Sequence, residues 1–163
     1  MKKLLLILSL AVMCSSVARA EHFDDIADGM EAYLKKDYVA ALKLLRPLAE
    51  QGYASAQHNL GVMYANGEGV IQNYKEAVKW YRLAAGQGDG EAQNSLGVMY
   101  ANGEGVIQDY VLAHMWSNLA ASNGNEKGSR NRDKVSALMT ASKISEAQDM
   151  AKDCIKKSYK NCY

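Results

Sequence analysis

The feature that most constrains this chain is an internal repeat: the stretch Leu60–Gln72 recurs without change at Leu96–Gln108, an offset of 36 residues. A period of this length indicates stacked supersecondary units, each of which buries its hydrophobic face against the next. Each copy contains two stretches suited to helices, which no proline interrupts, and Asn66-Gly67 is a strong helix-stop signal between them. We therefore predict an all-α fold, an α-α superhelix, with helices near residues 55–65 and 74–86 in the first full copy.

The differences between the copies separate buried from exposed positions. The second helices keep the same residue types at steps of three and four, which predicts one buried stripe: Tyr74 and Tyr110, Ala77 and Ala113, Trp80 and Trp116, Ala84 and Ala120. Between these positions, charged residues of the first copy, such as Lys75 and Lys79, become apolar in the second. The apolar replacements Val111, Leu112 and Met115 must be covered, and we expect the C-terminal region to cover them.

A degenerate copy precedes the two full ones, and a non-repeating region follows them. In that region Thr140 can cap a last helix reaching about residue 157, after a helix near residues 126–139. Two such helices would close the open end of the solenoid, with Leu138, Ile144, Ala147, Met150, Ala151 and Cys154 on one side. We divide the chain into a signal peptide at 1–20, a degenerate tetratricopeptide-like repeat at 21–53, full repeats at 54–89 and 90–125, and C-terminal capping helices at 126–163.

The repeat motif, A-x-x-x-L-G-x-M-Y-x-x-G-x-G-V-x-x-D/N-Y-x-x-A-x-x-W, resembles that of the Sel1-like repeat (SLR) family, relatives of tetratricopeptide repeats. The resemblance implies a superhelix whose first helices line a concave side that binds a peptide or protein partner. Mapped onto this chain, the implied contact residues are Ser55, His58, Val62, Asn66, Glu91, Asn94, Val98 and Asn102. This face is polar with a small apolar centre, and its asparagines can bond the backbone of an extended segment.

The N-terminus has the three parts of a secretory signal: Lys2-Lys3, an apolar run, and Ala18-Arg19-Ala20. The run is too short to span a bilayer, so we expect cleavage after Ala20, export to the periplasm or beyond, and no transmembrane segment afterwards. Lipidation of Cys14 stays open, although Met13 is bulkier than the residue a lipoprotein signal needs. Cleavage removes three basic residues and leaves 16 against 18 acidic ones, which argues against nucleic-acid binding.

Two cysteines remain after cleavage, Cys154 and Cys162, and an oxidising compartment permits a disulfide between them. The alternative, a metal site, lacks further ligands nearby. The histidines His22, His58 and His114 stand at no metal-binding spacing. Since Asn94 replaces His58 and Val78 replaces His114 in the other copy, we expect His58 and His114 on the surface.

We find no pattern that indicates catalysis, a metal or a cofactor. The Asn-Gly-Glu-Gly stretch lacks the strand and the Gly-Lys-Ser/Thr of a phosphate loop, and a helix-helix turn explains it. Some disulfide-rich members of the resembling family are associated with penicillin binding and β-lactamase activity. This chain contains neither the Ser-x-x-Lys, Ser-Asp-Asn and Lys-Thr-Gly motifs nor Gly-x-Ser-x-Gly.

The sequence thus predicts a non-enzymatic protein, an adaptor or scaffold that binds a protein of the cell envelope. Alternatives are an immunity-type protein that neutralises an exported effector, a hydrolase of cell-wall or β-lactam substrates, and a released protein that binds host proteins. The partner's identity and the oligomeric state stay open.

Overall fold

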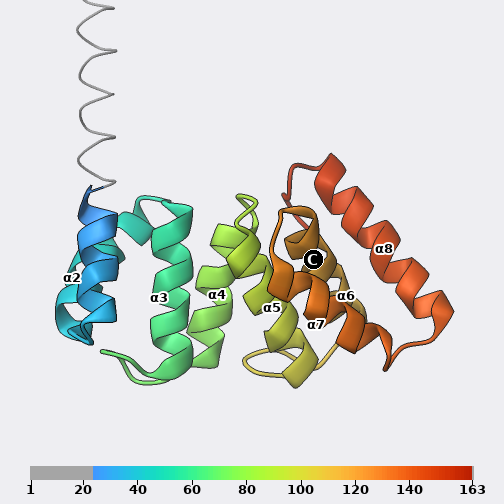
Figure 1. Cartoon of the computed structure of the whole chain (residues 1–163), viewed down its shortest axis with the longest axis horizontal. Coiled ribbons are helices and arrows are strands. Elements are labelled where there is room, and N and C mark those ends of the chain that lie inside the picture. Colours follow the sequence, from blue (N-terminus) through green and yellow to red (C-terminus); the bar gives the residue numbers. More distant parts are fainter. Residues whose placement is uncertain (1–23, 163) are drawn as a thin grey trace, which may run out of the picture.

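The computed structural model describes residues 24–162, and every regular element in that range is a helix (Figure 1). A helix over residues 24–34 is followed by α2 (Tyr38–Glu50), α3 (Ala54–Asn66), α4 (Tyr74–Ala85), α5 (Gly90–Asn102), α6 (Tyr110–Ser122), α7 (Glu126–Ser136) and α8 (Ala141–Lys156). From α2 to α7 each helix packs against the next, and α8 folds back onto α6. The predicted all-α superhelix is confirmed. The predicted signal peptide, Cys14 and His22 lie outside the described residues.

Side-chain and glycine caps fix where the helices begin and end. The side chains of Asp37, Asn73, Asp89, Asp109, Asn125 and Thr140 each accept a hydrogen bond from a backbone N–H in the first turn of the helix that follows. At the other end, Gly67 and Gly103 close α3 and α5 in the left-handed conformation, with φ of 73° and 75°. The Asn-Gly stop signal therefore acts as predicted.

The second glycine of each turn has a different role from the first, because it packs one repeat against the previous one. A Cβ added to Gly69 would lie 2.9 Å from the carbonyl oxygen of Tyr38, at the start of the preceding second helix. Gly105 approaches the carbonyl of Tyr74 in the same way one repeat later. The glycine-rich turn is thus both a helix end and a contact between repeats.

The core confirms the stripe predicted for the second helices. Ala77, Trp80 and Ala84 are buried on α4, and their counterparts on α6 are buried too. Met115 is fully buried because α7 and α8 both pack on α6, as expected, whereas the other two apolar replacements, Val111 and Leu112, are half-buried. The expectation for Leu138 is wrong: α7 ends at Ser136, so Leu138 lies in the turn before α8 and is 65% exposed.

Two buried amide side chains, Gln57 and Gln93, join successive units at the turns between repeats through bonds to the exposed amides Gln87 and Asn123. Gln87 donates through Nε2 to Gln57 Oε1 at 2.8 Å, and Gln57 donates to the carbonyl of Ala49 at 3.0 Å. One repeat later, Asn123 donates to Gln93 Oε1 at 2.8 Å. These hydrogen bonds satisfy amides that would otherwise be buried without partners, and they fix the spacing of the repeats.

An arginine on each of α2 and α4 also contacts the tyrosine of the first helix that follows. Arg46 Nη2 donates to the hydroxyl of Tyr64 at 3.1 Å, and Arg82 Nη2 donates to that of Tyr100 at 2.6 Å. These hydrogen bonds help to fix the angle at which one unit meets the next.

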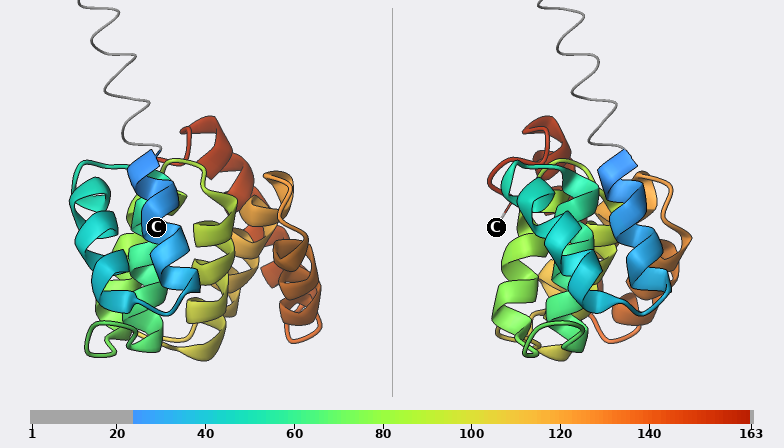
Figure 2. Two further views of the ribbon diagram at one scale, coloured as in Figure 1. Left: turned by 60° about the vertical axis from the view of Figure 1, so that its left-hand side comes forward. Right: turned by 90° about the vertical axis from the view of Figure 1, so that its left-hand side faces the viewer.

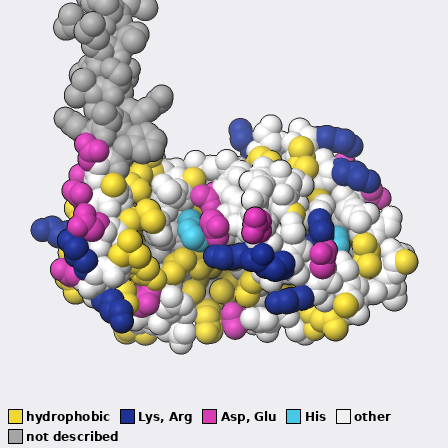
Figure 3. All heavy atoms as spheres, viewed as in Figure 1, with side chains coloured by type: hydrophobic (Ala, Val, Ile, Leu, Met, Phe, Trp, Pro, Cys, Tyr) yellow, Lys and Arg dark blue, Asp and Glu magenta, His cyan; other side chains and the backbone are white. Residues whose placement is uncertain are grey.

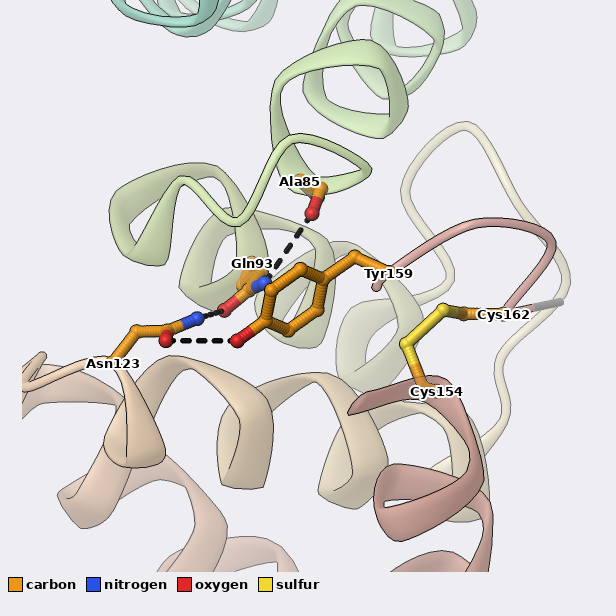
Figure 4. Close-up of a disulfide and its surroundings, with 6 residues drawn as sticks. All are labelled: Ala85, Gln93, Asn123, Cys154, Tyr159 and Cys162. Carbon is orange, nitrogen blue, oxygen red and sulfur yellow. Dashed lines mark hydrogen bonds between the residues drawn. A yellow bond between two sulfur atoms is a disulfide. The ribbon is translucent and has the colours of Figure 1, made fainter. Parts of the chain in front are cut away.

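The C-terminus folds back across two turns and is held by a disulfide (Figure 4). Cys154 near the end of α8 is joined to Cys162, with their Cα atoms 5.0 Å apart. Within the closed loop, the hydroxyl of Tyr159 donates to Asn123 Oδ1 at 3.0 Å, and its ring lies beside Gly88. The disulfide thereby places Tyr159 at the junction between the turns that follow α4 and α6.

Candidate functional site

The first helices of the successive units face one side of the molecule. Seen along the long axis, helix 24–34 and α7 lie on the same side and α4 lies on the other (Figure 2, right). Burial has the largest effect on His58 of α3 and holds its pKa below the usual value. Asp89 and Glu91, at the start of α5, raise that pKa, and Lys127 of α7 lowers it. Along the long axis of the molecule, α3, α5 and α7 follow one another in this order (Figure 1). Figure 3 shows hydrophobic side chains inside this hollowed face and charged ones around it.

The predicted contact residues of the first full repeat lie along α3. Ser55 and Asn66 are exposed at its two ends, and Asn66 donates to Glu68 at 3.1 Å. His58 and Val62 are half-buried between them, and the His58 ring lies 5.7 Å from that of Tyr81. The central part of α3 thus carries one imidazole and one aliphatic side chain, both partly exposed. We call the hollowed face along α3, α5 and α7 the groove.

The predicted residues of the second full repeat lie along α5 and differ in accessibility. Glu91 and Asn102 are exposed and Val98 is half-buried, whereas Asn94 is only 8% exposed. Asn94 lies beneath α7, where its Oδ1 accepts a hydrogen bond from Asn131 at 2.8 Å. Contact between a partner and any of these eight residues stays a prediction, and Asn94 has to be uncovered before a partner can touch it.

A pocket of about 610 Å³ opens at the end of the groove, between α5 and α7. Its floor is formed by Gly97 of α5 and Ser117 of α6. The walls combine apolar and polar side chains: Val98, Ala101, Val135 and Leu138, with Asn102, Gln108, Tyr110, Asn131 and Lys134. Two of the predicted contact residues, Val98 and Asn102, are therefore brought together here with residues of α7.

The polar groups of the pocket suit binding rather than nucleophilic chemistry. Ser117 is fully buried, and its hydroxyl has no hydrogen-bond partner among the described residues. A serine nucleophile is activated by a hydrogen bond to an adjacent base, and among the described residues no such bond is made by Ser117. Asn131 uses its amide nitrogen on Asn94, which leaves its Oδ1 able to accept a hydrogen bond from a ligand.

The histidines form no metal centre in the described chain, where no group of three or more His, Cys, Asp or Glu side chains is placed to hold an ion. The expectation that His114 lies on the surface is wrong: it is 1% exposed, because α7 covers α6 at this point. Burial and the nearby Arg132 lower the pKa of His114, and Asp133 opposes them. His58 is half-buried, so the expectation of a surface position holds for it only in part.

Sequence reasoning missed the α7 side of the pocket because it treated α7 only as a cap. At the repeat offset of 36, Asn125 aligns with Asp89 and Val135 aligns with Met99. Asn125 and Asp89 cap their helices in the same way, and Val135 and Met99 are both buried. Helix α7 is therefore the first helix of a further, incomplete unit. Aligning the sequence with itself at an offset of 36 residues could have shown this.

Comparison with known proteins agrees with this geometry. A family model described as Sel1 repeat matches residues 28–53, 54–89 and 90–125. No curated protein matches the chain. The crystal structure of c5321, described as a protective antigen present in uropathogenic Escherichia coli strains displaying an SLR fold, is 29% identical with a TM-score of 0.81, and the match covers 90% of this chain but 32% of that one. The Sel1 repeat protein from Oxalobacter formigenes is 34% identical with a TM-score of 0.63, and the match covers 77% of this chain and 98% of that one.

Proposed function

Because this chain belongs to the Sel1 repeat family, whose members generally serve as protein–protein interaction modules, we propose that it is an adaptor or scaffold that binds a polypeptide partner. The partner lies in the groove bordered by α3, α5 and α7. The observation that carries this proposal is the pocket at the end of that groove, where Val98 and Asn102 meet the residues of α7. Apolar walls with a few polar groups are what a binding site for a side chain requires.

We propose that the partner is a protein of the cell envelope. The signal pattern at residues 1–20 supports export, and the Cys154–Cys162 disulfide is of a kind that persists in oxidising compartments. Within residues 24–162, no helix is long and apolar enough to cross a membrane. These features favour a protein that works in the periplasm or beyond it.

One comparison favours a second candidate, which is release from the cell and contact with host proteins. The similar protein c5321 is described as a protective antigen, and release from the cell is one way in which an antigen meets the host. Fractionation of culture medium tests this role: recovery of the chain from medium in the absence of cell lysis supports it, and retention of the whole amount in the envelope excludes it.

Hydrolysis of β-lactams or cell-wall material is less well supported by the groove. Ser117 makes no hydrogen bond to a base among the described residues, and the sequence holds none of the serine motifs searched for. Purified protein that turned over a chromogenic β-lactam would contradict this assignment.

The binding proposal is tested by photo-crosslinking in living cells. A photoreactive amino acid at Asn102 lies exposed at the pocket, and the same residue at Lys79 lies exposed on α4 as the matched control. We expect one partner to be captured from Asn102 and not from Lys79, with mass spectrometry identifying it. Equal capture from both positions, or none from Asn102 in cells that hold the folded protein, would contradict the groove as the binding site.

A further inference from the structure

The pocket stands where the two full repeats differ in one large side chain. Tyr81 on α4 and Ser117 on α6 are 36 residues apart and occupy equivalent positions in the repeat. Tyr81 is 3% exposed and packs on Gly61, where an added Cβ would lie 2.6 Å from the ring. The equivalent glycine, Gly97, is retained in the next repeat, but a serine faces it there.

The partner of the tyrosine hydroxyl also has an equivalent. Burial raises the pKa of Tyr81 to about 12, and a hydrogen bond with Ser95 opposes that rise. At the offset of 36, Asn131 occupies the position of Ser95 and lines the pocket. The second repeat therefore keeps the glycine on which the tyrosine ring would lie and a polar side chain that could bond its hydroxyl. The tyrosine itself is replaced by Ser117.

The space left by the missing ring opens into the groove. The pocket of about 610 Å³ is larger than a phenol ring, so it can admit one that enters from outside the scaffold. The apolar walls, Val98 and Val135, flank the floor. The Oδ1 of half-buried Asn131 is free to accept a hydrogen bond, so an occupant that carries a hydroxyl gains a contact that a purely aliphatic one lacks.

We propose that this pocket receives a tyrosine side chain of the bound partner, which takes the position that Tyr81 fills within the preceding repeat. The ring lies on the backbone at Gly97 between Val98 and Val135, and its hydroxyl donates to Asn131 Oδ1. This inference rests on the proposed function, and it names the anchor residue of the partner. A tyrosine anchor combines a large buried area with one polar contact, as interface hot spots commonly do.

The test uses p-cresol, which is the side chain of tyrosine as a free molecule. The chain is expressed from its full sequence, purified as the cell processes it, labelled with ¹⁵N and titrated with p-cresol and with toluene. We expect amide shifts that cluster at Gly97, Val98 and Ser117, with half-saturation on the order of 1–10 mM for so small a ligand. Toluene should bind several-fold more weakly, because it cannot bond Asn131. This comparison needs no variant.

Ser117→Tyr supplies the missing ring from within the chain and should abolish the p-cresol shifts, since Gly97 leaves room for it as Gly61 does for Tyr81. Ser145→Tyr, on the exposed surface of α8, is the matched control and should leave the shifts unchanged. Equal binding of toluene and p-cresol, shifts elsewhere in the protein, or no shifts at about 50 mM would overturn the inference. If the crosslinking from Asn102 still captured a partner after such a result, the proposed function would stand without a tyrosine anchor.

Discussion

The two full repeats differ at many positions outside the run Leu60–Gln72, and at His114 the difference brings an ionisable group into the core. Its equivalent in the preceding repeat, Val78, is also buried. Burial and Arg132 hold the pKa of His114 below its usual value in the folded protein. The unfolded chain therefore takes up this proton first, so the stability contributed by neutral His114 is present above the ordinary histidine pKa of about 6.5 and is lost as the pH falls toward the lowered folded value.

His114→Val should accordingly make folding less sensitive to acid. We expect the free energy of unfolding of the unaltered protein to fall between about pH 7 and pH 5, with a slope of at most about 1.4 kcal/mol per pH unit for each such histidine. The variant should lose the part of the pH slope that comes from His114. It should keep the part that comes from His58, whose pKa is lowered as well. Urea unfolding at several pH values measures the slope, and His58→Asn, which copies Asn94, is the comparison. An unchanged slope in His114→Val would contradict the assignment.

At this scale the sequence predicted part of the site and missed the rest for a physical reason. Val98 and Asn102 line the pocket and were among the predicted contacts, but Asn131 and Lys134 were not. The exchange of Tyr81 for Ser117 is visible in the sequence, yet it predicts a pocket only when the neighbouring helices are known. A position that varies between copies can be exposed, buried under another helix, or at the edge of a pocket. His114 shows that variability alone does not distinguish these cases.

Single helices were predicted more completely than the contacts between them. Periodicity and capping residues gave α3 to α6 to within one or two residues, because these signals are local to each helix. The end of α7 was predicted three residues too late. The chain turns after Ser136, and the N–H of Leu138 bonds back to Val135 at 2.9 Å so that the chain can reach the cap at Thr140. That turn is set by where α8 must lie on α6, which the local sequence does not specify.

The C-terminal disulfide should stabilise one element rather than the whole fold. Replacing both Cys154 and Cys162 by serine should lower the free energy of unfolding by about 2–3 kcal/mol, as expected for a short closed loop. Amide exchange should quicken at the end of α8 and at the turn after α6, where Tyr159 bonds Asn123. Hydrogen-exchange mass spectrometry measures this, and α3 should keep its protection. Tyr159→Phe removes only the hydroxyl contact and should reproduce a small part of the effect; equal deprotection of α3 would show that the disulfide acts globally.

Across the whole molecule, each unit is stabilised by packing against its neighbours. The core falls into two clusters, one around Leu45, Leu60 and Trp80 and the other around Leu96, Trp116 and Leu119. In such an array each repeat is stabilised by its own fold and by the interface with the next one. The second cluster ends at α7 and α8, and α7 with Leu138 in the turn after it also forms the far wall of the proposed binding pocket. Closing the solenoid and forming the pocket are therefore tasks of the same segment.

Removing residues 126–163 should expose the second cluster while leaving the first one packed. Met115 and Trp116 are fully buried on α6, and α7 and α8 are the helices that follow and cover it. We expect the shortened chain to bind a hydrophobic dye, to associate in light scattering, and to shift its tryptophan emission to the red because Trp116 gains water while Trp80 stays in the first cluster. Removing only residues 157–163 is the control and should leave the emission near its original wavelength. A monomeric shortened chain with unchanged emission would mean that α6 can close the solenoid alone, and α7 would then serve the binding groove rather than the stability of the fold.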